Sequence, residues 1–380
     1  MAGFPVFCLN EGMIIGIDAR ELCDRPAGKG QYLLRVVAQW VSHPELMLVL
    51  YTKPGQIVPA QVIGPTVKQV EVPGRGLLWH RAVSRHLLKD KVAVFFAALS
   101  YQSSLWNKVP TVTVVHDLAV FRLPGLAHNR RAKWVERLTL KQAVKRSVAL
   151  IAVSDSTKDD LVELMGADPQ KVEVFYEAAL LGATGNPLSR LERGGYFLFT
   201  GTLEPRKNVS TLLRAYALLP QEIRYQYRLK LAGKPGWGGE DYRALAGQLG
   251  VGENCDFLGY VSDSELEKLF RQAYALVYPS FYEGFGLPVI EAMACGTPVV
   301  TSNISSLPEV VGPEGLTASP HDPAAVVALM LRLVSEPALW DRQSQYLYLR
   351  STQFNWEVIA NQVVGSLERA VADPVHPPLK

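Results

Sequence analysis

The sequence has few cysteines, no long apolar run and almost no net charge. Its four cysteines among 380 residues are scattered and show no metal-ligand spacing, which excludes a disulfide scaffold and predicts no bound metal. The most apolar stretch, Val92–Leu99, is too short to cross a bilayer. The formal net charge of +3 argues against a strongly basic nucleic-acid-binding protein. We therefore expect a globular protein of the reducing cytoplasm that does not bind nucleic acid.

The small net charge conceals an asymmetry between the two halves of the chain. Residues 1–190 carry more Lys and Arg than Asp and Glu, whereas residues 191–380 carry more acidic than basic side chains. In the first half, cations recur at every third or fourth residue in two sets, which places each set on one face of a helix. The sets are Arg81, Arg85 and Lys89, and Arg130, Lys133, Arg137 and Lys141. Each set is either a solvated helix face or a surface for anionic lipid headgroups or a lipid-linked acceptor, and the sequence leaves both interpretations open.

Apolar, β-branched runs alternate with longer helical patterns along the whole chain. Runs such as Thr111–Val115 and Tyr196–Thr200 are continuously apolar, which is typical of strands buried on both faces of a parallel sheet. This alternation predicts an α/β protein with two doubly wound Rossmann-like domains facing a cleft. The turn-rich segment Glu177–Pro187 predicts the connection between them. The predicted parts are residues 1–190, residues 191–354 and a C-terminal helix in residues 355–380.

Two glutamates flank a turn and a predicted helix start, directly after the predicted strand Ala275–Tyr278. The motif reads Glu283, Gly284, Phe285, Gly286, Leu287, Pro288 and, after more apolar residues, Glu291. Glycines allow a backbone to approach a ligand, and free N–H groups at a helix start attract anions. An acid that complements the helix dipole would explain Glu283 but not Glu291, which lies inside an apolar run. The motif therefore predicts two carboxylates that face one ligand.

Arg206 and Lys207 follow the predicted strand Tyr196–Thr200 and precede a helical pattern. Two adjacent cations at this place can neutralise a diphosphate, Arg206 through its forked guanidinium and Lys207 as a point charge. The alternative is a solvated pair, but the helix dipole disfavours cations at a helix start. The pair therefore favours a phosphate site.

His116 and Asp117 end the predicted strand Thr111–Val115, whose carboxyl end should point into the cleft. The alternative is a hydrogen-bonded pair with a structural role. The position favours a functional role for His116, and it leaves Asp117 open between a functional group and an orienting partner.

Gly28, Lys29 and Gly30 follow the first predicted strand. They lack the third glycine and the spacing of a dinucleotide-binding fingerprint, which argues against a nicotinamide cofactor.

The order and content of these motifs resemble those of retaining glycosyltransferases with the GT-B fold, particularly the large family four, or group 1, of bacterial polysaccharide synthesis. The resemblance spans roughly residues 13 to 357. It implies that Glu283 lies against the donor sugar, that Glu291 binds the ribose hydroxyls and that the backbone of Gly284, Phe285, Gly286 and Leu287 holds sugar and phosphate.

The resemblance also assigns roles outside this motif. It implies that His116 lies near the reacting sugar and that the loop of Gly28 and Gly30 covers the donor phosphates. Lys207 matches the lysine of the donor-phosphate loop, and Arg206 would replace an arginine that many relatives carry where this chain has Thr202. Lys29, between the glycines, departs from the family pattern. The last helix is expected to cross back to the N-terminal domain.

The resemblance therefore implies a retaining, metal-independent hexosyltransferase without a cofactor. It would move a sugar from a nucleoside-diphosphate donor, a UDP- or GDP-sugar, to a saccharide or lipid-linked acceptor in surface polysaccharide synthesis, with His116, Glu283, Lys207 and Arg206 as catalytic residues. The alternatives are a sugar-nucleotide epimerase of the same fold and a catalytically silent subunit that docks on a membrane. The expected location is the cytoplasm, at the inner face of the plasma membrane if the basic helices bind lipid.

Overall fold

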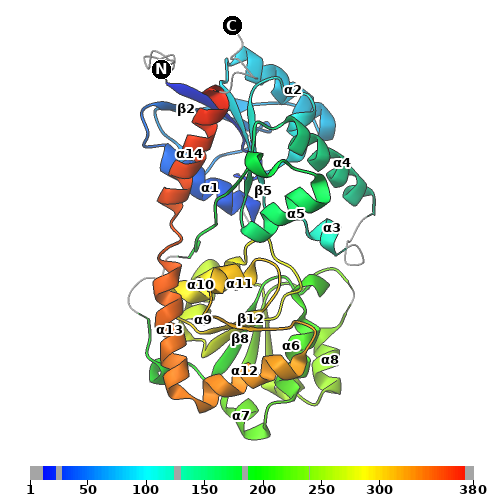
Figure 1. The fold of residues 1–380 in the computed structure, drawn as a ribbon, viewed down its shortest axis with the longest axis vertical. Coiled ribbons are helices and arrows are strands. Elements are labelled where there is room, and N and C mark those ends of the chain that lie inside the picture. The colour runs from blue at the N-terminus through cyan, green and yellow to red at the C-terminus, as the bar shows by residue number, and fades with distance from the viewer. Residues whose placement is uncertain (1–11, 23–27, 124–129, 182–186, 239, 373–380) are drawn as a thin grey trace.

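The computed structural model describes residues 12–22, 28–123, 130–181, 187–238 and 240–372, and within them it leaves out the side chains of residues 104 and 130–134. Two parallel β-sheets lie one above the other, and helices cover each of them (Figure 1). The prediction of two doubly wound α/β domains is therefore confirmed.

The N-terminal domain is built on a seven-stranded parallel sheet with the order β3-β2-β1-β4-β5-β6-β7. Its strands are β1 (Met13–Asp18), β2 (Leu46–Thr52), β3 (Val67–Glu71), β4 (Val94–Ala97), β5 (Thr111–Val115), β6 (Ala149–Ala152) and β7 (Val172–Val174). Its helices are α1 (Lys29–Trp40), α2 (Gly76–Lys89), α3 (Ala119–Arg122), α4 (Arg130–Arg146) and α5 (Asp155–Met165). Every residue of β4 and β5 is buried, as strands covered on both faces must be.

The C-terminal domain is built on a six-stranded sheet with the order β10-β9-β8-β11-β12-β13. Its strands are β8 (Tyr196–Thr200), β9 (Arg228–Ala232), β10 (Cys255–Gly259), β11 (Ala275–Tyr278), β12 (Val299–Ser302) and β13 (Leu316–Ala318). Its helices are α6 (Val209–Ala217), α7 (Gln221–Gln226), α8 (Tyr242–Gln248), α9 (Asp263–Gln272), α10 (Leu287–Ala294), α11 (Leu307–Val311), α12 (Pro323–Ser335) and α13 (Pro337–Ser351). Burial of each large apolar side chain in these sheets contributes roughly 1.5–3 kcal/mol.

The last helix, α14 (Trp356–Ala372), leaves the C-terminal domain and packs against α1 of the N-terminal domain (Figure 1). The indole N–H of Trp40 donates to the carbonyl of Ala360 at 3.1 Å, and that of Trp356 donates to the carbonyl of Ala179 at 2.9 Å. The chain thus ties the two domains together at its C-terminal end as well as through the connection between β7 and β8.

Two strands differ from the expectation. The sequence patterns did not predict β3 or β13, because β3 is a half-exposed edge strand with the polar sequence VKQVE and β13 has only three residues. Neither segment has the long apolar run that marks a strand buried on both faces.

No single helix in the described ranges is long and apolar enough to cross a membrane. A bent pair, residues 323–335 and 337–372, passes that test by length and composition only, with an angle of 103° between its parts. In the structure these helices bury apolar side chains within the two domains, for example Met330 and Leu333 in α12.

Candidate active site

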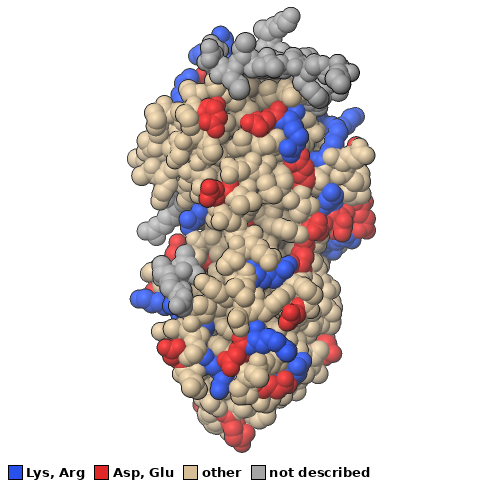
Figure 2. Space-filling model, turned by 60° about the vertical axis from the view of Figure 1, so that its left-hand side comes forward, with Lys and Arg blue, Asp and Glu red and all other residues tan. Residues whose placement is uncertain are grey.

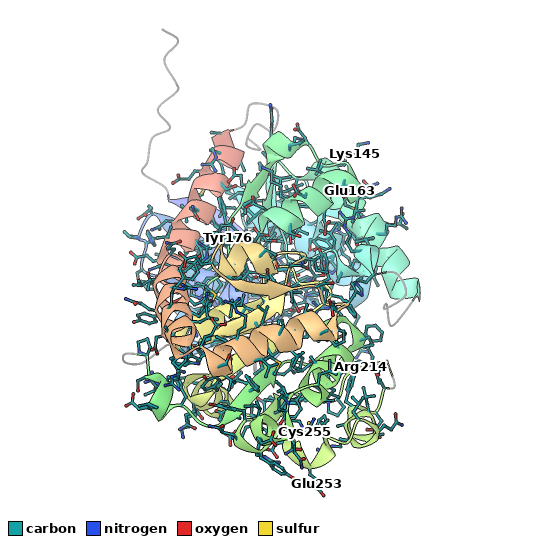
Figure 3. All side chains as sticks on the ribbon, turned by 60° about the horizontal axis from the view of Figure 1, so that its bottom comes forward. Lys145, Glu163, Tyr176, Arg214, Glu253 and Cys255 are labelled. Carbon is teal, nitrogen blue, oxygen red and sulfur yellow. The ribbon has the colours of Figure 1, made fainter. Side chains whose placement is uncertain are left out.

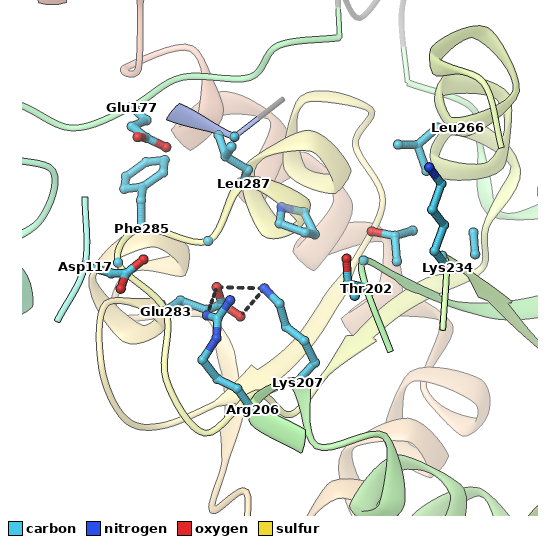
Figure 4. A pocket seen from close by; sticks show the side chains of 18 of the residues that line it. Asp117, Glu177, Thr202, Arg206, Lys207, Lys234, Leu266, Glu283, Phe285 and Leu287 are labelled. Carbon is cyan, nitrogen blue, oxygen red and sulfur yellow. Dashed lines mark hydrogen bonds and ion pairs between the residues drawn. The ribbon is translucent and has the colours of Figure 1, made fainter. Parts of the chain in front are cut away.

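The carboxyl ends of the strands bring most of the predicted motifs to one cavity of about 590 Å³ between the domains. The N-terminal domain contributes Gly28, Lys29, His116, Asp117 and Glu177 to its lining. From the C-terminal domain come, among others, Thr202, Arg206, Lys207, Lys234, Glu283, Gly284, Phe285, Gly286 and Leu287. In Figure 4, Arg206 and Lys207 converge on Glu283, with Asp117 on one side and Thr202 and Lys234 on the other.

Glu283 is the centre of a buried ion-pair network. Lys207 Nζ donates to both of its carboxylate oxygens at 2.7 and 2.9 Å, and Arg206 Nη1 donates to Oε2 at 3.0 Å. The hydroxyls of Tyr278 and Ser280 donate to Oε1 at 3.0 and 2.7 Å. Burial alone would raise the pKa of Glu283, but the charges of Lys207 and Arg206 outweigh it and lower this pKa to about 2. Glu283 is therefore an ionised carboxylate at neutral pH.

The two cations are not a solvated pair, because their side chains are only 21% (Arg206) and 11% (Lys207) exposed. Arg206 is held in place by Glu204, whose Oε1 accepts from Nε and Nη2 at 3.1 and 2.9 Å. The other oxygen of Glu204 accepts from the indole N–H of Trp237 at 3.1 Å. Burial lowers the pKa of Lys207, and Glu283 opposes this shift. Buried Lys207 and half-buried Arg206 thus face two carboxylates, Glu204 and Glu283, at the edge of the cavity.

Two glycines allow the backbone to form this site. Gly286 precedes α10 with a φ of 112°, which disfavours any side chain, and Pro288 stands in the first turn. Gly286, Leu287 and Pro288 line the cavity, so the positive end of the α10 dipole faces it and favours an anion there. A Cβ atom at Gly284 would lie 1.7 Å from the carbonyl oxygen of His116, so only glycine lets the two domains approach here.

His116 is fixed by the protein at both ring nitrogens. Nδ1 lies 3.1 Å from Oε1 of Glu177, and Nε2 lies 3.0 Å from the carbonyl oxygen of Ala98. Because a carbonyl only accepts, Nε2 carries a proton, and a second proton must lie between Nδ1 and Glu177. His116 can therefore exchange a proton with a substrate only by giving up one of these contacts. Sequence reasoning placed Glu177 at the start of the interdomain connection and missed this contact.

Glu291 lines a second, adjoining cavity of about 850 Å³, which shares Thr200, Lys234, Leu287 and Pro288 with the first. Its carboxylate accepts from the backbone N–H groups of Leu180 at 2.6 Å and Leu181 at 3.1 Å. Burial raises the pKa of Glu291 to about 7, although these N–H groups and Arg35 oppose the shift. The two glutamates of the motif thus face neighbouring parts of the cleft, and their pKa values are shifted in opposite directions.

Phe285 joins the two domains through its ring. Its centroid lies 6.1 Å from that of Tyr176 and 5.7 Å from that of Phe354, and Tyr176 lies where the domains meet (Figure 3).

The remaining predicted residues lie away from the two cavities. Gly30 is buried in α1 and lines neither cavity. Arg81, Arg85 and Lys89 are exposed on α2, and Arg137 and Lys141 are exposed on α4. Arg130 and Lys133 lie in α4, but their side chains are outside the described part of the structure. The described residues contain no group of three or more His, Cys, Asp or Glu side chains that could hold a metal ion.

Two family models match the chain, "Glycosyl transferases group 1" over residues 187–350 and "Glycosyltransferase Family 4" over residues 28–178. The chain is 36% identical over 265 residues to O-antigen chain mannosyltransferase B of Escherichia coli, across 67% of this chain and 69% of that protein. It is 30% identical over 278 residues to the serotype-specific mannosyltransferase WbdA of Escherichia coli, across 68% of this chain but only 33% of that longer protein.

Solved structures share the fold across nearly the whole chain. Sucrose-phosphate synthase from Thermosynechococcus elongatus superposes with a TM-score of 0.75 at 20% identity, covering 94% of this chain and 98% of that one. Anabaena HepE in complex with UDP-glucose superposes with a TM-score of 0.71 at 18% identity, covering 94% of this chain and 99% of that one. At these identities the likeness concerns the fold alone, and the predicted GT-B architecture is confirmed.

Proposed function

The chain belongs to the group 1 glycosyltransferases, and from this membership we propose that it transfers a mannosyl group from a nucleoside-diphosphate sugar to an acceptor in surface polysaccharide synthesis, with retention at the anomeric carbon. The observation that carries the proposal is the meeting of Lys207, Arg206 and Glu283 beside the start of α10. The names of two relatives support mannose as the sugar. The neighbour in complex with UDP-glucose supports a nucleotide-sugar donor.

The donor diphosphate would compete with Glu283 for the two cations. Lys207 and Arg206 neutralise Glu283 in the structure, and a diphosphate placed beside them and the positive end of the α10 dipole would take over these hydrogen bonds. Glu283, once released, could accept hydrogen bonds from sugar hydroxyls. Glu291 would accept from the ribose hydroxyls in the adjoining cavity.

The proposed reaction breaks the bond between the anomeric carbon and the donor phosphate oxygen and forms a bond from that carbon to the acceptor oxygen on the same face. The acceptor proton passes to the leaving phosphate oxygen. Negative charge grows on the diphosphate during this step, and Lys207, Arg206 and the positive end of the α10 dipole stabilise it without a metal ion. His116, held at both ring nitrogens, lies beside the reacting sugar and does not move this proton.

The test is an assay of the purified full-length protein with a panel of GDP- and UDP-sugars and a mannoside acceptor. We expect transfer from one donor, and we expect Lys207→Ala and Glu283→Gln to lower kcat by roughly 100- to 1,000-fold, as loss of one charge-stabilising group does elsewhere. Lys268→Ala, which removes an exposed lysine of α9 outside the cavity, serves as the matched control. Full activity in both cavity variants would contradict the proposal, as would the absence of transfer from every donor.

We further propose contact with an anionic membrane through the α2 surface, defined as Leu77, Leu78, Arg81, Arg85 and Lys89. Leu77 and Leu78 are 50% and 72% exposed, and the three cations lie on the same helix. Exposed leucines beside cations suit the boundary between lipid headgroups and acyl chains better than they suit water. The protein would then work at the inner face of the plasma membrane.

A further inference from the structure

We infer that Asp117 binds a hydroxyl group of the acceptor, and that the acceptor group which meets the donor is a neutral sugar rather than a phosphate. This inference depends on the proposed function. It assigns a role to Asp117 and chooses between the saccharide and the lipid-phosphate classes of acceptor.

Asp117 stands where the two domains meet over the reacting centre. It follows β5, and a Cβ atom built on Gly284 would lie only 3.0 Å from the Cβ of Asp117. Its side chain is half-buried, lines the cavity of about 590 Å³ and lies beside Glu283 and Arg206 in Figure 4. A group bound to Asp117 would therefore lie next to a sugar bound at Glu283.

One oxygen of Asp117 is available to a ligand. Oδ1 accepts from the backbone N–H of Ala119 at 3.1 Å. Within the described ranges the structure gives Oδ2 no hydrogen-bond partner. The nearby cations have other partners in the described structure. Arg206 donates to Glu204, Tyr282 and Glu283, and Lys29 Nζ lies 5.6 Å from the ring centroid of Tyr101. An ionised carboxylate only accepts hydrogen bonds, so the group that fits Oδ2 is a donor such as a sugar hydroxyl.

The charges on the N-terminal wall disfavour a phosphate as acceptor. Asp117 and Glu136 lie near Lys29, and Tyr101, Asp117 and Glu136 raise its pKa against the effect of burial. Two carboxylates thus act on one cation in this part of the wall. A phosphate placed beside Asp117 would be repelled by this carboxylate, whereas a hydroxyl would gain a charge-assisted hydrogen bond.

The experiment uses the purified full-length protein, its preferred nucleotide sugar and two probes, octyl mannoside and undecaprenyl phosphate. We expect transfer to the mannoside and not to the phosphate. In Asp117→Asn the KM for octyl mannoside should rise about tenfold or more, as expected for loss of a charge-assisted hydrogen bond, while the KM for the donor stays within about twofold. Asp159→Asn, at an exposed aspartate of α5, is the matched control.

A purely structural role for Asp117, limited to its bond with Ala119, predicts a different result. The loss would then appear in the melting temperature and in both KM values, or in none of them. An unchanged acceptor KM, a parallel loss of donor binding, or a wild-type protein that prefers undecaprenyl phosphate or does not use the mannoside would overturn the inference. If the wild-type protein neither transfers nor hydrolyses any nucleotide sugar, the proposed function itself fails.

Discussion

Glu283 and Glu291 show how the pKa of one residue type can shift in opposite directions within one motif. Glu283 is bonded to two cations and two hydroxyls, so burial cannot keep it protonated. Glu291 is equally buried, but within the described residues it accepts hydrogen bonds from two backbone N–H groups and from no cation, so burial prevails and its pKa rises to about 7. Neighbouring carboxylates with separated pKa values are typical of sites where each has a different task.

The raised pKa of Glu291 predicts a pH-dependent stability. Its pKa is about 7 in the folded chain against the usual 4.5 of a glutamate in water, so the folded state holds this proton more tightly. Between these pH values the unfolded chain binds fewer protons, and the free energy of unfolding should fall as pH rises, by about 3 kcal/mol in total. In Glu291→Gln this loss should vanish. Melting temperatures of both proteins from pH 4.5 to 8 provide the test, and identical pH profiles would contradict it.

At the scale of elements, the two domains are joined by contacts between α5 of one and the loops around α10 and α11 of the other. Glu309 of α11 accepts from the backbone N–H groups of Asp155 at 2.9 Å and Ser156 at 3.1 Å, at the start of α5. The hydroxyl of Tyr282, beside the glutamate motif, donates to Asp160 and accepts from the N–H of Leu118. One of the contacts between the domains is therefore a carboxylate at a helix N-terminus, a favourable arrangement.

Removing that carboxylate should open the cleft. In Glu309→Ala we expect a loss of about 1 kcal/mol in the closed state, hence a transfer rate about fivefold lower and a larger radius of gyration by small-angle X-ray scattering. Glu314→Ala changes an exposed glutamate nearby and should leave both quantities unchanged. If Glu309→Ala lowers only the melting temperature, the contact stabilises the fold without governing closure.

The sequence predicted the strands and motifs that have a local sequence pattern, and it missed the contacts that depend on how distant segments pack together. Continuously apolar runs such as those of β5 and β8 predict buried strands. Most of the predicted cavity residues belong to motifs that directly follow such strands. The turn-rich segment around Glu177 predicts an interdomain connection. It does not predict the contact with His116, because His116 lies far away in the sequence. Tyr278 and Ser280 donate hydrogen bonds to Glu283, but their sequence positions predict only the end of a strand and a turn. Contacts of this kind arise from tertiary structure and leave no local pattern.

At the scale of the whole molecule, the excess of basic residues in the first half of the chain and of acidic residues in the second is not visible as separate charged surfaces on every face. On the face drawn in Figure 2, acidic and basic side chains are interspersed over both domains. The exposed cations of α2 are distinguished instead by the exposed leucines beside them. The membrane proposal therefore concerns the α2 surface and not the net charge of the N-terminal domain.

Vesicle binding tests that distinction. Each Lys or Arg near an anionic membrane contributes about 1 kcal/mol, so Arg81→Ser with Arg85→Ser should weaken binding to vesicles containing phosphatidylglycerol by roughly 30-fold. Leu77→Ser with Leu78→Ser should weaken it too, but without changing its dependence on salt, because only the charged contribution is screened. The matched control is Arg214→Ser with Arg342→Ser, two exposed arginines of the C-terminal domain. Equal losses of vesicle binding in the control and in the arginine pair of α2 would indicate non-specific attraction by net charge and contradict the proposal. A loss confined to the α2 variants would locate the membrane contact on α2 and thereby orient the cleft relative to the membrane.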